Sequence, residues 1–168
     1  MIILGIDPGT QVMGWGVVET DGSDVSMVGY GAIKVPDKLQ PAEKLNLLYK
    51  ELQKIINKYK PDNVAVEQPF VAKNVHSAFV VGRAQAMALL AAANKNIPAF
   101  EYTPAQVKQQ VANYGASSKE QIQEMVKLLL NLEEIPQPND AADALAIALC
   151  HAQEARVNEL IARQEPGR

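Results

Sequence analysis

The sequence predicts an α/β protein in which a mixed five-stranded sheet, an antiparallel meander followed by parallel strands, is flanked by helices. Three short runs rich in Val, Ile, Tyr and Gly follow one another near the start, with turn signals between them, as is typical of consecutive antiparallel strands. Further along, helical segments alternate with two more strand-like runs, which favours right-handed crossovers and parallel pairing. The 168 residues, 48% of them apolar, are enough for one core, so we expect a single domain over residues 1–168.

The first two thirds of the chain contain all the predicted strands and two helices. The segment "PAEKLNLLYKELQKIINKYK" places apolar side chains at helical spacing with Lys and Glu on the other face, and Pro61 closes it. "NVAVE" has the composition of a buried strand, and an alanine-rich helix follows it. The predicted strands are IILGID at 2–7, MGWGVVE at 13–19, VSMVGYGAIKV at 25–35, NVAVE at 63–67 and IPAFEY at 97–102, and the predicted helices span 41–60 and 77–96.

The last third of the chain has the pattern of several helices. Thr103 is expected to cap the first of them, with Gln106 completing a capping box. Ser117 and Glu120 predict a second box of the same kind. Two prolines then interrupt the chain, and a final helix is expected to begin with Asp140 as its N-cap.

Charge and cysteine content limit the classes of partner and compartment. The net charge of -3 argues by itself against a nucleic-acid partner, but residues 68–131 contain six basic and three acidic residues and so form a basic middle. A nucleic-acid surface and a chance arrangement of solvated charges both fit that pattern. The single Cys150 excludes an intramolecular disulfide, and we see neither a signal peptide nor about 20 apolar residues without a charge. We therefore expect a cytoplasmic protein with no membrane partner.

Two acidic residues stand at the ends of predicted strands. Asp7 opens the turn sequence Asp-Pro-Gly-Thr, and turn formation alone would explain it. Glu67, however, ends its apolar strand in the same way, and buried carboxylates are rare unless they are paired or bind a metal. The carboxyl edge of a partly parallel sheet is also where ligands tend to bind. The two residues together therefore favour a functional site.

A second pair of acids lies at the start of the final helix. Asp140 and Asp143 are three residues apart, so both project from one face of the first turn. Capping and the helix dipole explain each of them locally. If they converged with Asp7 and Glu67, four anions would repel one another unless hard divalent cations such as Mg²⁺ lay among the oxygens. Spacing alone leaves that convergence open.

Four segments of the chain resemble, in the same order and at the same spacing, the RuvC-type Holliday junction resolvases. These proteins are crossover junction endodeoxyribonucleases with an RNase H-like fold. The matching segments are GIDPGTQVMGWGVV, AVEQPFVAKN, EYTPAQVKQQVANYGASSKEQ and NDAADALAIALCH, so the resemblance covers almost the whole chain. It implies a structure-selective endonuclease that resolves four-way DNA junctions in recombination and repair. The expected reaction is a pair of symmetric hydrolytic nicks that leave 5′-phosphate and 3′-hydroxyl ends.

The resemblance also implies a role for each matching residue. The expected catalytic and metal-binding carboxylates are Asp7, Glu67, Asp140 and Asp143. The expected DNA-binding residues are Phe70, Lys73, Arg83, Lys108 and Lys119, and Lys119 is also expected to act in catalysis beside the scissile phosphate. Two Mg²⁺ ions per active site are implied, with Mn²⁺ as a substitute, because two cations can stabilise both the attacking and the leaving oxygen.

The implied partners are a second copy of the chain and a branch-migration helicase complex. Resolving a junction takes two cuts, whereas one chain supplies one set of four acids, so we expect a two-fold homodimer. The helix in "HSAFVVGRAQAMALLAAANKN" is apolar nearly all round. One side is expected to pack on the sheet, and the alanine-rich other side, with Ala88 on it, to meet the second copy. Burial of the whole helix within one domain is the alternative.

Two other functions were weighed against the nuclease. "GIDPGT" also resembles the first phosphate loop of the sugar kinase, actin and chaperone ATPase group, but those proteins need two such domains and a second Gly-rich loop. A non-catalytic junction-binding protein would have lost carboxylates that are all present here. Two departures from the resolvase pattern leave the junction contacts open: Pro69 stiffens the loop after Glu67, and Val80 and Val81 stand where many relatives carry a basic residue.

Overall fold

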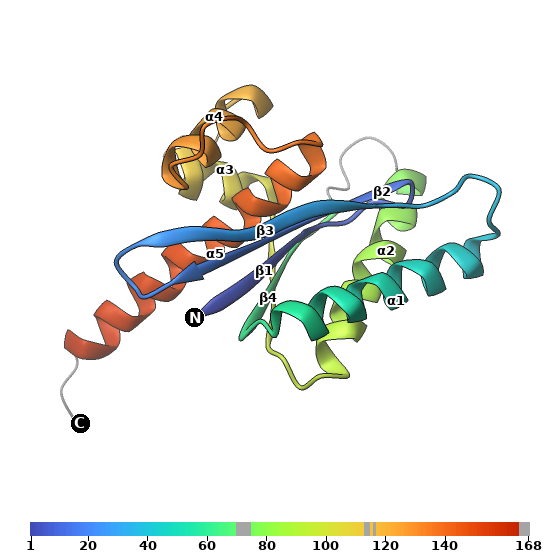
Figure 1. Ribbon diagram of the computed structural model, residues 1–168, viewed down its shortest axis with the longest axis horizontal. Helices are drawn as coiled ribbons and strands as arrows, with labels where there is room; N and C mark the ends of the chain where they lie inside the picture. The colour runs from blue at the N-terminus through green and yellow to red at the C-terminus, as the bar shows by residue number, and fades with distance from the viewer. Residues whose placement is uncertain (70–74, 113–114, 116, 165–168) are drawn as a thin grey trace.

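The computed structural model describes residues 1–69, 75–112, 115 and 117–164, which form one mixed sheet with helices on both faces (Figure 1). The strand order is β3-β2-β1-β4-β5, with β1 (Ile2–Asp7), β2 (Val12–Thr20), β3 (Val25–Lys34), β4 (Asn63–Glu67) and β5 (Ala99–Tyr102). The helices are α1 (Pro41–Tyr59), α2 (Val75–Ala93), α3 (Pro104–Ala112), α4 (Lys119–Leu129) and α5 (Asn139–Gln164). The predicted fold class is confirmed, and the predicted strands end within one or two residues of the observed ones.

The central strand β1 brings the meander and the parallel part of the sheet together. It pairs antiparallel with β2 and parallel with β4, while β2 pairs antiparallel with β3 and β4 parallel with β5. As a result β1, β3, β4 and β5 all end at the same edge of the sheet. Ile6 pairs with Val66, so the next residues, Asp7 and Glu67, end their strands as neighbours.

The two-residue period of the strands decides which face each side chain reaches. On β1, Leu4 and Ile6 belong to the core shared with α1 and α2, whereas Ile3 belongs to the core shared with α5. Because side chains alternate along a strand, Asp7 lies on the α5 face. The same alternation on β4 places Glu67 there as well. Both carboxylates are therefore directed to the side of the sheet that α5 covers.

Glycines in the sheet let α5 lie directly on β1 and β2. A Cβ added at Gly5 would collide with the backbone oxygen of Ala144, and one added at Gly14 with that of Asp140. Only glycine allows such a close approach of two backbones. The first turn of α5 is thereby held over the edge of the sheet at which Asp7 ends its strand.

The starts of α3 and α4 test the predicted capping boxes. The α3 box is confirmed: the Thr103 backbone N–H donates to Gln106 Oε1 at 2.8 Å, and the Gln106 N–H donates to Thr103 Oγ1 at 3.2 Å. The α4 box is shifted by one residue, because Ser118 caps the helix and exchanges hydrogen bonds with Gln121. The expected cap, Ser117, is buried instead. Either of the two adjacent serines could have capped the helix, and in the folded protein Ser117 is buried while Ser118 is the cap.

The start of α5 also differs from the prediction by one residue. The helix begins at Asn139, so Asp140 belongs to its first turn and the expectation that it is the N-cap is wrong. The backbone N–H of Ala141 donates to the carbonyl of Pro138 at 2.9 Å, which tightens this turn. Asp140 and Asp143 nevertheless share one face of the helix, as their spacing predicted.

Helix α2 buries most of its alanines and exposes several of its larger apolar side chains. Ala84, Ala88 and Ala91 are fully buried, whereas Val75 and Phe79 are 73% and 61% exposed. The expectation that Ala88 lies on an outer, alanine-rich face is therefore wrong: small side chains let α2 come close to α1 and β4. By length and composition α2 is the one helix of the described part of the chain that could cross a membrane.

Replacing Gly5 by alanine is expected to destabilise the protein by about 1–3 kcal/mol, the usual cost of overpacking, because the added methyl group meets the backbone of α5. Urea denaturation measures the loss. Gly115→Ala is the matched control, since a Cβ there meets nothing closer than Gln109 Oε1 at 3.7 Å. Equal stability of the two variants would contradict the role given to Gly5.

Candidate active site

A cleft of about 330 Å³ lies where the carboxyl edge of the sheet meets α3, α4 and the first turns of α5. Its lining residues are Asp7, Glu67, Pro104, Val107, Lys108, Lys119, Ile122, Asp143 and Ala146. Three of the four carboxylates predicted from the sequence therefore share one cleft with two of the predicted lysines. The three carboxylates come from two strands and from the helix that packs on those strands.

The fourth predicted carboxylate, Asp140, stands at the margin of this group. It is not among the residues that line the cleft. Its negative charge nevertheless acts on Asp7, whose pKa it helps to raise, and its backbone lies against Gly14 on β2. The structure thus brings all four acids to one end of the sheet, with Asp7, Glu67 and Asp143 in the cleft itself.

Burial and neighbouring charges raise the pKa of two of these carboxylates, Asp7 and Glu67. Burial is the largest cause that raises the pKa of Asp7 to about 8. The charges of Glu67, Asp143 and Asp140 act in the same direction, and the charge of Lys119 opposes them. Burial and then the charge of Asp143 raise the pKa of Glu67 to about 7, against the two lysines of the cleft. The site therefore concentrates more negative charge than the protein by itself stabilises.

Lys119 is the cation in closest contact with these acids. Its Nζ lies 2.6 Å from Asp143 Oδ2, with the Lys119 side chain 55% exposed and that of Asp143 18% exposed. The hydrogen bond to Asp143 is the main cause that raises the pKa of Lys119, so its ammonium group stays charged. Lys119 opens α4 and Lys108 lies in the middle of α3, so two helices each supply one positive charge to the wall facing the sheet edge.

The donor groups of the cleft fit a hard divalent cation. The acids that line it are carboxylates, the oxygen ligands that Mg²⁺ prefers. A cation among them would favour the ionised forms of Asp7 and Glu67 against the burial and the neighbouring negative charges that raise their pKa. Within the described ranges, no three His, Cys, Asp or Glu side chains are grouped as the ligands of one ion. Asp143 is instead held by Lys119. The chemistry of the donors therefore fits a metal, while Asp143 is engaged by a lysine.

The remaining predicted DNA-binding residues lie away from this cleft or outside the described residues. Phe70 and Lys73 fall in the segment 70–74, which the described ranges omit. Arg83 is on the exposed side of α2, where its guanidinium lies 4.6 Å from the centroid of the Phe79 ring, and it does not line the cleft. The structure thus places Lys108 and Lys119 beside the carboxylates, but not Arg83.

Apolar residues of α3, α4 and α5 complete the cleft, and sequence reasoning gave them no place in it. Val107, Ile122 and Ala146 each lie next to, or three residues from, a charged cleft residue on the same helix. That helical spacing from a charged residue is the sequence feature that could have placed these apolar residues in the cleft, but ordinary core residues show the same spacing. The apolar wall matters because it lowers the local dielectric, which strengthens every charge interaction inside the cleft.

The sequence and the fold were then compared with known proteins. The family model described as crossover junction endodeoxyribonuclease RuvC matches residues 3–151. A crossover junction endodeoxyribonuclease RuvC of Dehalococcoides mccartyi is 53% identical over 163 residues, which cover 97% of this chain and 98% of the relative. One from Alkaliphilus oremlandii is 49% identical over 160 residues, covering 95% and 98% of the two chains.

Solved structures of the same name share the fold. The Thermus thermophilus RuvC structure superposes with a TM-score of 0.86 at 35% identity, covering 94% of this chain and 97% of that one. T. thermophilus RuvC in complex with a Holliday junction substrate gives a TM-score of 0.85 at 34% identity, covering 94% and 96%. Because the family model and the relatives span nearly the whole chain, with the acidic cleft inside the matched region, the protein belongs to the RuvC family of crossover junction endodeoxyribonucleases.

Proposed function

We propose that this protein resolves four-way DNA junctions in recombination and repair by nicking two opposed strands. The observation that carries the proposal is the cleft in which Asp7, Glu67 and Asp143 face Lys108 and Lys119, in a chain of the RuvC family. The T. thermophilus relative has been solved with a Holliday junction as its substrate. We expect phosphodiester hydrolysis that leaves 5′-phosphate and 3′-hydroxyl ends. Incubating a synthetic four-way junction with the protein, with and without Mg²⁺, and scoring paired nicks tests it.

The four carboxylates are proposed as the ligands of two Mg²⁺ ions, for which Mn²⁺ can substitute. Support comes from the all-oxygen donor set and from the raised pKa values of Asp7 and Glu67. When bound, such ions stabilise the attacking and the leaving oxygen of an in-line displacement. Asp7, on the central strand and close to the charges of the other three acids, is the candidate for a ligand shared by both ions.

The two lysines are proposed to act on the phosphate in different ways. Lys119 touches Asp143, so its ammonium lies where it can offset the charge that develops on the phosphate in the transition state. Lys108 lines the same cleft, forms no ion pair within the described part of the chain, and is proposed to hold the DNA backbone. The apolar wall beside both lysines excludes water from part of the cleft.

We also propose that the working unit is a two-fold homodimer joined through the exposed side of α2. A groove of about 440 Å³ runs along this side, lined by Val75, Ala78, Phe79, Gly82, Arg83 and Ala86. Large exposed apolar side chains in a contiguous groove are typical of an interface, and two copies would supply the two cuts that a junction needs. This surface replaces the buried Ala88 side as the candidate contact.

Three further proposals rest on the resemblance and on composition. The chain is proposed to act as one RNase H-like nuclease domain and to receive junctions from a branch-migration helicase complex. A cytoplasmic location agrees with its lone, buried Cys150 and a DNA substrate. The two-domain ATPase alternative gains no support, because relatives that this chain covers almost end to end are named as nucleases.

Asp7→Asn is expected to lower the rate of junction cutting by about 10³-fold or more while junction binding survives, because the variant keeps the shape but loses a charged ligand. Since the folded-state pKa of Asp7 is raised to about 8, its ionisation opposes folding above the unfolded pKa of 3.8. The variant should therefore be no less stable than the wild type at pH 7 in metal-free buffer. A large fall in melting temperature would instead support the turn-forming role of Asp7.

Lys119→Ala is expected to slow single-turnover cutting at saturating enzyme with little change in junction affinity. Lys108→Ala should mainly weaken binding, and more so at low salt, because a phosphate contact is screened as salt rises. Lys127→Ala, on the same helix as Lys119 but outside the cleft, is the control and should change neither quantity. An unchanged cutting rate for Lys119→Ala would remove it from the chemistry.

Phe79→Asp is expected to convert the dimer to a monomer and paired nicks to single ones, because it places a charge in the apolar groove of α2. Sedimentation equilibrium at micromolar concentration measures the first effect. Val157→Asp is the matched control, since Val157 is 52% exposed on α5, outside that groove, and should leave the dimer intact. A monomeric wild type, or a dimeric Phe79→Asp protein that still makes paired nicks, would refute the interface.

A further inference from the structure

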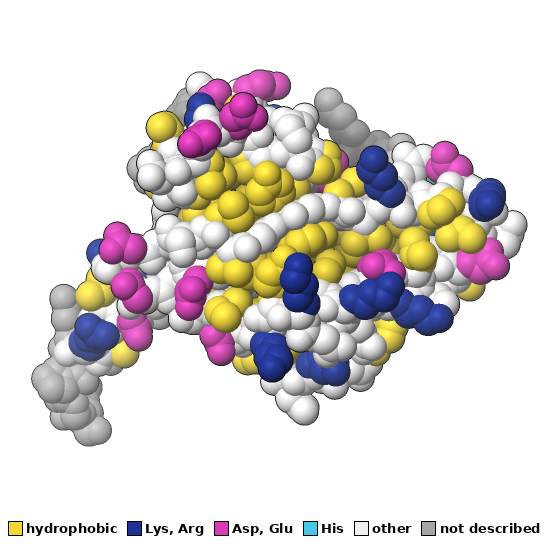
Figure 2. All heavy atoms as spheres, in the orientation of Figure 1, with side chains coloured by type: hydrophobic (Ala, Val, Ile, Leu, Met, Phe, Trp, Pro, Cys, Tyr) yellow, Lys and Arg dark blue, Asp and Glu magenta, His cyan; other side chains and the backbone are white. Residues whose placement is uncertain are grey.

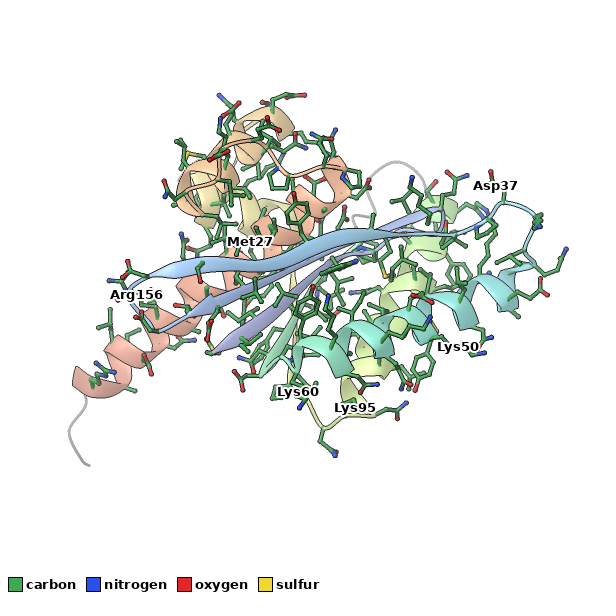
Figure 3. The ribbon with its side chains drawn as sticks, viewed as in Figure 1. Met27, Asp37, Lys50, Lys60, Lys95 and Arg156 are labelled. Atoms are coloured by element: carbon green, nitrogen blue, oxygen red, sulfur yellow. The ribbon has the colours of Figure 1, made fainter. Side chains whose placement is uncertain are left out.

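The outer side of α1 carries a row of lysines that the active site does not use. Lys50, Lys54 and Lys58 follow one another at four-residue intervals, so they share one side of the helix, and all three are exposed. Lys60 and Lys95 extend the group: Lys95 follows Asn94, whose amide donates to the Tyr49 hydroxyl of α1 at 2.7 Å. Figure 2 shows dark blue side chains gathered over α1, and Figure 3 shows Lys50, Lys60 and Lys95 directed away from the sheet.

Few negative charges balance this row. Residues 41–60 contain five lysines and two glutamates. Glu43 accepts the backbone N–H of Gln40 at 2.8 Å in the cap of α1, and Glu51 pairs with Lys54 at 2.6 Å, on side chains 36% and 70% exposed. The other ion pairs of the described residues lie on α4 and α5. Like charges four residues apart cost a helix a few tenths of a kcal/mol each, which offsets the gain from the Glu51–Lys54 pair and from Lys58 in the last turn.

Helix α1 begins near the catalytic edge and leads away from it, and Lys50, Lys54 and Lys58 run from its middle to its far end. β3 runs parallel to β1 and ends at the same edge of the sheet, and α1 starts after a short loop from there (Figure 1). With 19 residues at about 1.5 Å each, α1 runs about 28 Å back along the sheet. It covers the face opposite to α5, so its lysines are separate from the cleft. A polyanion that left the catalytic edge along α1 would meet these lysines in turn.

We propose that the outer side of α1, through Lys50, Lys54 and Lys58, binds the sugar-phosphate backbone of a duplex arm of the junction. The proposal rests on the proposed function, because it takes the substrate to be branched DNA. Lys50 and Lys58 are about 12 Å apart along the helix, a length over which duplex DNA carries about seven charges. Exposed lysines, with the exposed amide of Asn57 between Lys54 and Lys58, suit contacts that are independent of base sequence.

An acidic surface on a protein is the other polyanion that could cover this row. Protein interfaces are depleted in lysine and enriched in aromatic and other large apolar anchors. Among the described residues, none of the exposed large apolar side chains belongs to α1; they lie on other elements, such as Phe79 on α2 and Leu128 on α4. A lysine row without an apolar anchor favours DNA.

The experiment compares the wild type with the triple variant Lys50→Gln, Lys54→Gln and Lys58→Gln on junctions with arms of about 25 base pairs and with hairpin-closed arms of about 4 base pairs, at several salt concentrations. For long arms, the slope of log Kd against log salt should fall by about 0.9 per lysine. Between 50 and 200 mM salt, the wild type should then lose about 40-fold more affinity than the variant. Short-arm junctions should bind both proteins alike, and single-turnover cutting at saturating enzyme should be unchanged.

The matched control removes three positive charges elsewhere, by Lys127→Gln, Arg156→Gln and Arg163→Gln on α4 and α5, and should leave the long-arm slope at its wild-type value. An equal fall in the control would show a net-charge effect and overturn the proposal. An unchanged slope in the α1 variant would also overturn the proposal and would leave an acidic protein as the partner of the row. An equal loss of affinity on short-arm junctions would overturn it as well. A wild type that binds junctions but cuts none would instead refute the proposed nuclease.

Discussion

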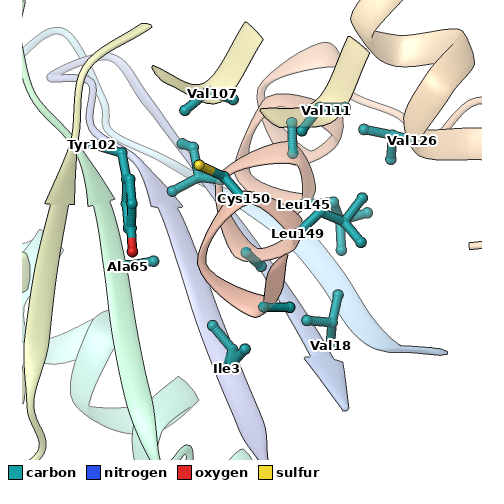
Figure 4. Packing of buried hydrophobic residues seen from close by; sticks show 14 of the residues in the cluster. Ile3, Val18, Ala65, Tyr102, Val107, Val111, Val126, Leu145, Leu149 and Cys150 are labelled. Carbon is teal, nitrogen blue, oxygen red and sulfur yellow. The ribbon is translucent and has the colours of Figure 1, made fainter. Parts of the chain in front are cut away.

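The direct contact of α5 with the glycines of β1 and β2 is the constraint on which the site depends. Leu145 and Leu149 of α5 share one core with Ile3 and Val18 of the sheet, and Figure 4 shows these side chains facing one another. Any side chain at Gly5 would push the helix outward. Because Asp143 stands near the start of the same helix, the distance between helix and sheet sets the distance between its carboxylate and those on the strand ends.

The other half of α5 is attached to the sheet by a buried histidine. His151 Nδ1 lies 2.7 Å from the Tyr102 hydroxyl, and its Nε2 lies 2.9 Å from the Asn63 amide nitrogen. Because that amide donates, Nε2 accepts and the proton of the neutral ring is on Nδ1. Burial lowers the pKa of His151 and keeps it neutral. The ring also stacks on Phe100 with centroids 4.4 Å apart. His151 thus joins β4 and β5 to α5, which explains its burial without a catalytic role.

The charged residues of the cleft and those of α1 have different roles. In the cleft, burial and then the charges of neighbouring carboxylates raise the pKa of Asp7 and Glu67, and the protein offsets part of that repulsion with Lys119. This arrangement costs folding free energy, which is typical of sites that bind and act on a charged ligand. On α1 the lysines are exposed and screened, so they add to long-range attraction rather than to chemistry. Burial is what separates the two groups.

The strands, the main helices and the acidic residues of the site could be predicted from the sequence alone. Alternating apolar runs set the strands, Asp7 and Glu67 were visible at strand ends, and the spacing of Asp140 and Asp143 placed them on one helix face, as the structure confirms. These features depend on neighbours in the chain, whose backbone periods are known in advance. The other residues of the site were predicted from the similarity of four segments to a known family.

How distant segments meet could not be predicted from the sequence, because it depends on packing. The sequence could not say which side of α2 is exposed, because both sides are apolar, and packing against α1 and β4 put Ala88 inside and Phe79 outside. Counting charges along the chain marked 68–131 as basic, whereas folding groups the lysines of α1 with Lys95. The convergence of the acids depends on the pairing of β1 with β4 and on glycines that admit α5. Such contacts depend on the shape and volume of surfaces far apart in sequence, which local propensity does not encode.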